Sequence, residues 1–228
     1  MKSKSLFCDE NSIELVGRLK VIRELMSKGK FSLSLGCKET RFADINLDID
    51  SSVNPDIVAD ARHLPFRDCV FQQVLFTDVI EHLPDGDEIK ALQEIYRVLC
   101  NGGELVLTTP HNNVFYTFLD PAKYVIIHRH YKRKCVEDLL KNHGFQIEMT
   151  FIAGGLWTCL NTLWYCVITY PLKRIFNHHF SYIPLFMQIR QNQEYRVITP
   201  DGYTIFVRAK KMDANTFCKN ASHTKVKK

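Results

Sequence analysis

The segment "ADARHLPFRDCVFQQVLFTDVIEHLPD", residues 59–85, contains the strongest clue to the fold. Its central run, Val70 to Val79, is mostly apolar and predicts a buried strand that runs into a turn. The polar pair Thr77 and Asp78 lies near the end of that run. Ligands bind beyond the carboxyl ends of the strands in an open α/β sheet, so this pair marks a candidate binding site.

Strands and helices alternate along the chain on either side of this segment. Further strands are expected at residues 31–35, 45–49, 104–110, 145–152 and 203–210, and helices at 13–28, 87–99 and 135–142. The short run at residues 56–59 is either another strand or the lead-in to one. Such alternation predicts an α/β fold in which a mainly parallel sheet has helices on both faces.

The composition suits one compact domain. The chain has 228 residues, of which 46% are hydrophobic and 24% are charged, enough for a sizeable core. We expect a single domain over residues 1–211 and a basic, disordered tail over 212–228. The net charge of +5 is mild, so no nucleic acid partner is expected.

The cysteines give no sign of a metal site or of disulfides. None of the eight forms a CxxC pair, and no Cys/His pattern typical of zinc is present, so we predict no bound metal. The opening residues "MKSKSLFCDENS" contain no apolar signal-peptide core. Reduced thiols and a cytoplasmic location are therefore expected.

Four predicted strand ends carry glycine or polar residues in a recognisable order. They are Leu35-Gly36-Cys37, Asp48, Asp60-Ala61 and Thr77-Asp78, and "ALQEIYRVLCNGGELVLTTPH" follows at residues 91–111. From about residue 31 to 152, this set resembles class I S-adenosylmethionine-dependent methyltransferases of the small-molecule, methyltransferase-11-like type. The resemblance implies a Rossmann-like, doubly wound, seven-stranded sheet with an antiparallel last strand, and S-adenosyl-L-methionine as the cofactor.

The resemblance also implies roles for the residues at the strand ends. Gly36 would let the backbone approach the methionine end of the cofactor, because glycine has no Cβ. Asp48 would accept hydrogen bonds from the ribose hydroxyls, and Asp60 from the adenine amino group, beside the backbone N–H of Ala61. Asp78 would lie beside the methionine portion. The neighbouring residues Leu35, Cys37, Ile49 and Thr77 complete the implied cofactor-binding set.

Candidate catalytic residues follow the predicted fifth strand, where members of this family build the acceptor pocket. They are His111, His128, His130 and Tyr131, and a histidine with a pKa near neutrality would help to deprotonate a hydroxyl acceptor. Glu81 and His82 invite an acid–base interpretation as well. In the resemblance this pair supports the helix after the fourth strand, which favours a structural or site-wall role.

The first motif departs from the family pattern. Ser34 stands where the family usually has an acid, "CKET" replaces the second glycine, and Gln72 replaces an aspartate at the start of the fourth strand. The chain between Gly36 and Ile45 is also too short for the usual crossover helix. We therefore expect a more exposed cofactor and weaker binding than is usual in the family.

An uncharged stretch follows the core. Residues 149–172 contain no charged side chain, and Leu156, Trp157, Leu160, Leu163, Trp164, Val167 and Ile168 would share one helical face. Three interpretations remain open: a core or lid helix, an interfacial helix at residues 153–176 that touches lipid, and a membrane-spanning helix. The scattered Thr and Asn residues disfavour the last.

The sequence thus predicts methyl transfer to a small acceptor. We expect residues 153–199 to form an apolar lid or insertion before the final strand, and therefore a hydrophobic or lipid-linked acceptor. Two alternatives are a non-catalytic scaffold with this fold and a membrane-surface binding protein. A location at the periphery of a membrane is compatible with the enzyme and with the membrane-surface binding protein.

Overall fold

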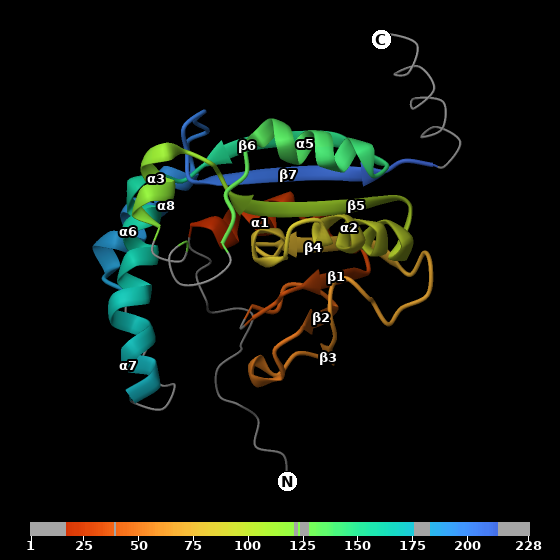
Figure 1. The fold of residues 1–228 in the computed structure, drawn as a ribbon, viewed down its shortest axis with the longest axis horizontal. Coiled ribbons are helices and arrows are strands. Elements are labelled where there is room, and N and C mark those ends of the chain that lie inside the picture. Colours follow the sequence, from red (N-terminus) through yellow and green to blue (C-terminus); the bar gives the residue numbers. More distant parts are fainter. Residues whose placement is uncertain (1–16, 39, 121–122, 124–127, 176–182, 214–228) are drawn as a thin grey trace.

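The computed structural model describes residues 17–38, 40–120, 123, 128–175 and 183–213, and it is built around one mixed sheet of seven strands (Figure 1). The strands are β1 (Ser32–Leu35), β2 (Ile45–Asp48), β3 (Ile57–Val58), β4 (Phe71–Thr77), β5 (Leu99–Pro110), β6 (Phe145–Ala153) and β7 (Thr204–Lys211). Their order is β3-β2-β1-β4-β5-β7-β6. The first five strands pair in parallel, and β7 is antiparallel to both of its neighbours, which confirms the predicted fold class.

The buried strands carry the apolar runs seen in the sequence. Leu33 and Leu35 of β1 are fully buried and lie opposite Val74 and Phe76 of β4. Both faces of these central strands are covered, which explains why their sequences are almost continuously apolar. One boundary was predicted wrongly, because β5 begins at Leu99 rather than at residue 104.

Helices pack on both faces of the sheet and at the end where the parallel strands finish (Figure 1). They are α1 (Arg18–Leu25), α2 (Asp87–Val98), α3 (Val114–Leu119), α5 (Arg133–Asn142), α6 (Leu156–Trp164), α7 (Tyr170–Ile175) and α8 (Leu185–Tyr195). Short 3₁₀ turns lie at Ser51–Val53 and Ile80–His82, and a π-helical turn, Tyr165–Thr169, joins α6 to α7. Residues of α2 and α5 pack into the larger core cluster, whereas α1 packs against Leu75, Val106 and Phe206 on the opposite face.

Two predicted segments extend beyond the described residues. The helix expected at residues 13–28 is seen as α1, Arg18–Leu25, and residues 1–16 lie outside the described part of the chain. Residues 214–228 of the expected basic tail and residue 176 of the expected interfacial helix also lie outside it.

A loop makes the crossover from β1 to β2. Among the described residues between Gly36 and Asp44, none is helical, as the short spacing predicted. Phe42 and Ala43 of this loop pack against the core cluster that includes Ile22 of α1. An N-terminal helix and a packed loop thus cover the face on which a crossover helix would otherwise lie.

The helix α6 and the π-helical turn after it turn polar side chains inward. Thr158, Asn161 and Thr169 are buried, whereas Leu156 and Val167 are exposed. A core helix would bury its apolar face, so the core-helix interpretation is wrong for this segment, and the lid interpretation remains. Within the described residues, no helix is sufficiently long and apolar to cross a bilayer.

The inward polar face has partners on α8. The Glu194 carboxylate accepts hydrogen bonds from the backbone N–H groups of Trp157 (2.8 Å) and Thr158 (3.0 Å). The Asn161 amide donates to the Gln191 side chain at 2.6 Å. Through these hydrogen bonds, α6 and α8 pack by polar contacts and leave apolar side chains at the surface.

Candidate functional site

A cavity of about 360 Å³ lies at the carboxyl ends of β1, β2 and β4. It is lined by the following residues from the predicted cofactor set: Gly36, Asp48, Ile49, Asp60, Ala61 and Asp78. Cys37 and Thr77 line a smaller adjoining hollow of about 60 Å³, and Leu35 lies fully buried beneath. The fold therefore brings the predicted strand-end residues to one edge of the sheet.

Gly36 lies with its backbone close to the side chain of Val79 at the cavity. Its backbone has φ of +67°, a conformation that glycine adopts without strain. A Cβ at this position would lie 2.3 Å from Cγ2 of Val79, well inside van der Waals contact. A side chain at this position would displace Val79, which also lines the cavity.

Asp48 holds the crossover loop as well as lining the cavity. One of its carboxylate oxygens accepts the backbone N–H of Lys38 at 2.9 Å, and the other accepts that of Asp50 at 3.0 Å. Asp48 is largely buried, and Ile49 beside it is 68% exposed at the cavity edge. A carboxylate has about four acceptor positions, so Asp48 can accept further hydrogen bonds.

Asp60 forms an ion pair with Arg62, a residue that the sequence had not indicated. The Arg62 guanidinium contacts both oxygens of Asp60, at 2.6 to 3.0 Å, and also contacts Asp87 at the start of α2. Hydrogen bonds from Arg62 lower the pKa of Asp60, so this carboxyl is ionised at neutral pH. Arg62 therefore fixes the acid that follows β3 at the cavity wall.

Asp78 follows β4 directly and has a left-handed conformation with φ of +53°. Thr108 on the neighbouring strand β5 donates its hydroxyl to the Asp78 carboxylate at 2.9 Å, and Arg18 of α1 forms an ion pair with it. Backbone strain of this kind persists when surrounding contacts fix it, and it clusters at functional sites. Arg18 lines the adjoining hollow and brings a cation that the sequence did not indicate to this end of the site.

Glu81 lies behind Asp78 and is almost completely buried, with 1% of its surface exposed. Its Oε2 accepts a hydrogen bond from the Thr109 hydroxyl at 3.1 Å. Burial, together with the nearby Asp78 carboxylate, raises the pKa of Glu81 well above its usual value. His82 follows it and lines the main cavity.

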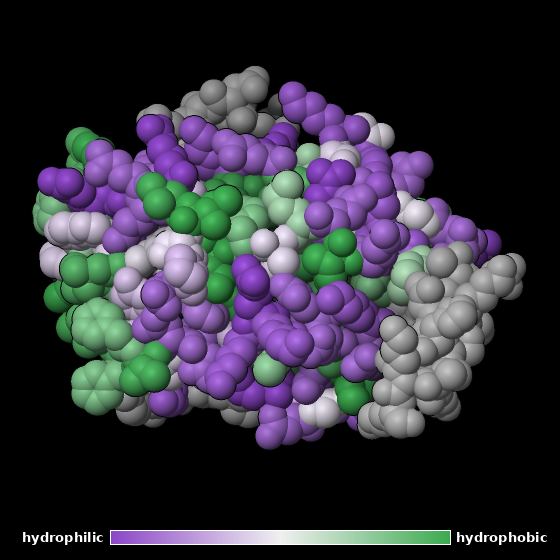
Figure 2. Space-filling view, turned by 90° about the horizontal axis from the view of Figure 1, so that it is seen from above, coloured by the Kyte–Doolittle hydropathy of each residue, from purple (hydrophilic) through white to green (hydrophobic). Residues whose placement is uncertain are grey.

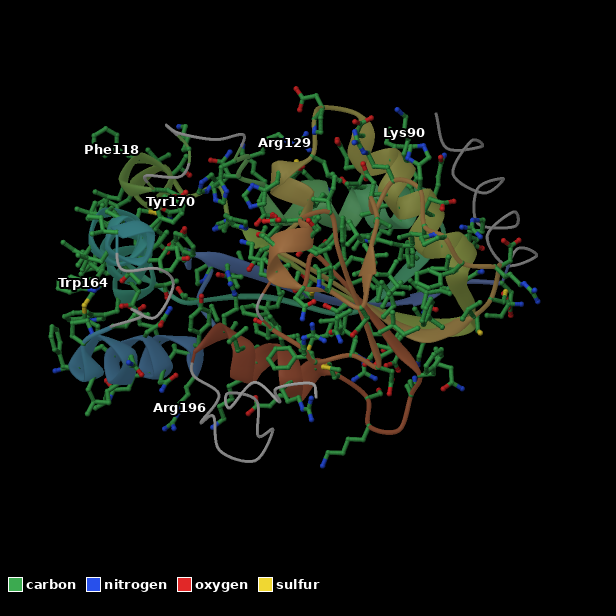
Figure 3. All side chains as sticks on the ribbon, turned by 90° about the horizontal axis from the view of Figure 1, so that it is seen from below. Lys90, Phe118, Arg129, Trp164, Tyr170 and Arg196 are labelled. Atoms are coloured by element: carbon green, nitrogen blue, oxygen red, sulfur yellow. The ribbon has the colours of Figure 1, made fainter. Side chains whose placement is uncertain are left out.

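The segment after α3 brings His128 and His130 to Asp120. Nε2 of each imidazole lies 3.0 Å from Oδ2 of Asp120, which is fully buried and also accepts the Tyr203 hydroxyl at 3.2 Å. Arg129, labelled in Figure 3, anchors the segment. Its backbone N–H donates to the Glu81 carbonyl at 3.0 Å, and its side chain donates to the Ile80 carbonyl.

The other two candidate catalytic residues, His111 and Tyr131, pair through their backbones in a β-bridge, but their side chains have different partners. His111 contacts the Gly202 carbonyl through Nδ1 at 3.1 Å and lines an open hollow of about 680 Å³ beside α3. Burial lowers its pKa, which favours the neutral imidazole. The Tyr131 hydroxyl donates to the Ile80 carbonyl at 3.3 Å, and burial raises its pKa above the usual value.

Comparison with known proteins gives this site a context. Residues 37–107 match the protein family described as "Methyltransferase domain". The chain is 30% identical over 150 residues to a probable S-adenosylmethionine-dependent methyltransferase of Mycolicibacterium smegmatis, covering 56% of this chain and 58% of that protein. It is 38% identical over 65 residues to the ubiquinone/menaquinone biosynthesis C-methyltransferase UbiE of Desulfotalea psychrophila, covering 27% of this chain and 26% of that protein.

Solved structures show the same fold. A methyltransferase of Thermotoga maritima, described as a possible histamine N-methyltransferase, aligns with a TM-score of 0.54 and 17% identity over 82% of this chain and 85% of that one. The fold is the one seen in S-adenosylmethionine-dependent methyltransferases, and residues 37–107 resemble their methyltransferase domain. More particularly, the match is to the methyltransferase-domain family, and fold and family imply S-adenosyl-L-methionine as the cofactor. The chain spans less than two thirds of the length of either curated relative.

Proposed function

We propose that the chain transfers a methyl group from S-adenosylmethionine to a small, apolar acceptor. The observation that carries this proposal is the cavity at the carboxyl ends of β1, β2 and β4, where Gly36, Asp48, Asp60 and Asp78 meet. When bound, the cofactor supplies a methyl group activated by a sulfonium. The task of the protein is then to hold donor and acceptor in line and to exclude water.

The residues around the cavity suit the parts of this cofactor. Free acceptor positions on Asp48 match the ribose hydroxyls, and the exposed side chain of Ile49 offers an apolar surface to the adenine. Arg62 engages the Asp60 carboxylate, so the nearby backbone N–H of Ala61 is the more available partner for the adenine ring. Arg18 supplies a cation near the methionine end, where Ser34 removes the family's usual acid.

An apolar acceptor is supported by the surface beside the site. Exposed apolar side chains gather on the helices beyond the carboxyl ends of the parallel strands: Val114, Phe115 and Phe118 of α3, Leu156 and Leu163 of α6, and Leu185 and Phe186 of α8. Figure 2 shows green side chains gathered at this end of the molecule. Such a patch is typical of binding sites for apolar ligands or partners.

Calorimetry with S-adenosylhomocysteine tests the proposal. Wild-type protein should bind it saturably, and Asp48→Ala should weaken binding at least tenfold, about 1.4 kcal/mol. Asp68→Ala is the matched control, because Asp68 is an exposed aspartate that pairs with Arg97 rather than lining the cavity. Folded wild-type protein that binds no S-adenosylhomocysteine would overturn the enzyme proposal and favour a non-catalytic scaffold.

A second candidate function is binding at a membrane surface. It is favoured by the orientation of α6 and of the π-helical turn that follows it, which bury Thr158 and Thr169 but expose Val167 and Ile168. In Figure 3, Phe118, Trp164 and Tyr170 lie at the same end of the molecule. Aromatic side chains are enriched where proteins meet the interface of a bilayer.

Co-sedimentation with vesicles tests this second candidate. Vesicles of phosphatidylcholine with phosphatidylserine should pellet the wild-type protein, and Val167→Ser with Ile168→Ser should reduce the pelleted fraction. Val58→Ser is the matched control, because Val58 is an exposed apolar residue on β3, at the opposite edge of the sheet. If all three proteins pellet with the vesicles to the same extent, or if the wild-type protein does not pellet, this candidate function is excluded.

A further inference from the structure

A cluster of potential metal ligands lies against the wall of the cofactor cavity. Glu81, His82 and His128 each offer one ligand atom, and these atoms all lie within 4.8 Å of one another. The rings of His82 and His128 are 5.0 Å apart between centroids. Because His82 also lines the cavity of about 360 Å³, the cluster reaches the space assigned above to the cofactor and acceptor.

Two buried atoms of this cluster have no hydrogen-bond partner among the described residues. They are Oε1 of Glu81, a residue that is 1% exposed, and Nδ1 of His128, whose side chain is 10% exposed. An unpaired buried polar atom loses its hydration without compensation, so native proteins rarely leave one without a reason such as a bound ion. A single cation between Glu81 and His128 would satisfy both atoms.

The remaining atoms of the same two side chains are already held by neighbours. Nε2 of His128 lies 3.0 Å from the Asp120 carboxylate, which fixes a proton on that nitrogen and leaves the lone pair on Nδ1. Oε2 of Glu81 accepts from Thr109 at 3.1 Å. A ligating histidine that donates its other N–H to a carboxylate is the usual arrangement around protein-bound metals.

We infer that Glu81, His82 and His128 bind a divalent first-row transition-metal ion at the acceptor side of the site. Two imidazole nitrogens and one carboxylate suit Mn²⁺, Fe²⁺, Co²⁺ or Zn²⁺, and three protein ligands leave coordination positions open. An oxygen of the acceptor can occupy one of them, and a bound metal ion lowers the pKa of a hydroxyl that it coordinates. This role, unlike ion binding itself, rests on the proposed methyl transfer.

A second set of ligands competes for the same ion. Asp120, His128 and His130 also lie within 4.8 Å of one another. Asp120, however, already accepts hydrogen bonds at Oδ2, and Nδ1 of His130 contacts the His111 carbonyl at 3.2 Å. Because the unpartnered atoms belong to Glu81 and His128, the first set is the better site, with Asp120 as the residue that positions His128.

The sequence shows why this site escapes motif searches. Glu81 and His82 are adjacent, but His128 lies far along the chain and joins them only because Arg129 fixes its segment to the carbonyls of Ile80 and Glu81. The absence of a Cys/His pattern led to the expectation of no metal, which this inference replaces with a site without cysteine.

Electron paramagnetic resonance with Mn²⁺ tests the inference on the full chain after treatment with EDTA. Mn²⁺ is the probe because carboxylate and imidazole bind it, whereas free cysteines prefer softer ions. Wild-type protein should bind one ion per chain, and Glu81→Gln and His82→Gln should each weaken binding at least tenfold. His63→Gln is the control for an exposed histidine, and circular dichroism establishes that every variant is folded.

Each outcome decides between the sites. Absence of saturable Mn²⁺ binding by the folded wild type, or equal binding by both variants and the wild type, overturns the inference. Loss of binding in His130→Gln but not in His82→Gln also overturns it, in favour of the competing set. Calorimetry on the same samples separates the two proposals: S-adenosylhomocysteine binding without Mn²⁺ binding refutes only the ion site, and the reverse refutes only the proposed cofactor site.

Discussion

Replacing Gly36 with alanine tests the close packing of Gly36 against Val79 in the cofactor cavity. The new Cβ would meet Cγ2 of Val79 at 2.3 Å, and the backbone at this position has φ of +67°. Gly29 provides a matched control, because it has φ of +74° but a Cβ added there would meet no atom within 4 Å. The pair therefore separates backbone strain from steric conflict.

The structure sets the expected magnitudes. Placing an L-residue in the left-handed region costs about 1–2 kcal/mol, and this cost applies to both variants. The Cβ of alanine at position 36 also forces Val79 to move by roughly 1 Å, and overpacking of this kind typically costs about 1–3 kcal/mol. We expect Gly29→Ala to lower the free energy of unfolding by about 1–2 kcal/mol and Gly36→Ala by about 3 kcal/mol.

Equilibrium urea denaturation measures both losses, and calorimetry with S-adenosylhomocysteine measures the effect on the site. Gly36→Ala should weaken ligand binding at least tenfold, whereas Gly29→Ala should leave it unchanged. Adding Val79→Ala to Gly36→Ala should recover the steric part of the loss, since it removes Cγ2. If the two single variants are equally destabilised and both bind the ligand normally, the close approach of Gly36 and Val79 does not govern the cavity.

Three further changes test other parts of the structure. Burial of Glu104 would raise its pKa, but hydrogen bonds from Lys30, Ser27 and Arg208 lower that pKa from 4.5 to about 2. The pKa of Glu104 is lower in the folded state than in the unfolded state, so its ionisation stabilises the fold by about 3 kcal/mol. This stabilisation is complete above about pH 4.5 and is lost as the pH falls toward 2. Glu104→Gln should flatten the pH dependence of the free energy of unfolding measured by urea denaturation. Asp120→Asn removes the charge that three buried donors share and should lower the free energy of unfolding by about 2–3 kcal/mol, and an unchanged melting temperature would contradict this. Val167→Ser changes a side chain that is 58% exposed and should shift the free energy of unfolding by less than about 0.5 kcal/mol, so a large loss in thermal denaturation would mean that this face is buried in solution.

The strands of the core could be predicted because each is a short apolar run with a turn or glycine after it. β4 and β6 lie within two residues of their predicted bounds. The start of β5 could not be predicted, because Leu99 pairs with Phe71 across an irregularity in the ladder. That pairing is a long-range contact, which local sequence pattern does not encode.

The orientation of α6 could not be predicted from the sequence either. Periodicity shows that two faces differ in polarity, but it does not show which face is buried. Here the polar face is buried because Glu194 and Gln191 of α8 bind it. The partners are more than 25 residues away along the chain, so local pattern alone could not decide which face is buried.

Some residues of the candidate site could be predicted from the sequence, and others could not. Gly36, Asp48 and Asp60 could be placed at one edge from their order, because parallel strands bring their carboxyl ends together. Arg62 and Asp120 could not, since each acts through side-chain contacts that no spacing encodes. The sequence therefore identified the positions fixed by topology and missed those fixed by tertiary contacts.

The short crossover links the stability of the sheet edge to the cofactor site. Gly36 donates its backbone N–H to the Leu47 carbonyl at 2.8 Å, and Asp48 accepts the backbone N–H of Lys38 from the other side of the loop. Two residues of the proposed cofactor set thus hold together β1, β2 and the loop between them. A ligand that binds Asp48 and packs over Gly36 must then stabilise this loop by mass action. Hydrogen exchange of the Lys38 amide should slow when S-adenosylhomocysteine is added, and an unchanged rate at saturation would show that the loop and the ligand are independent.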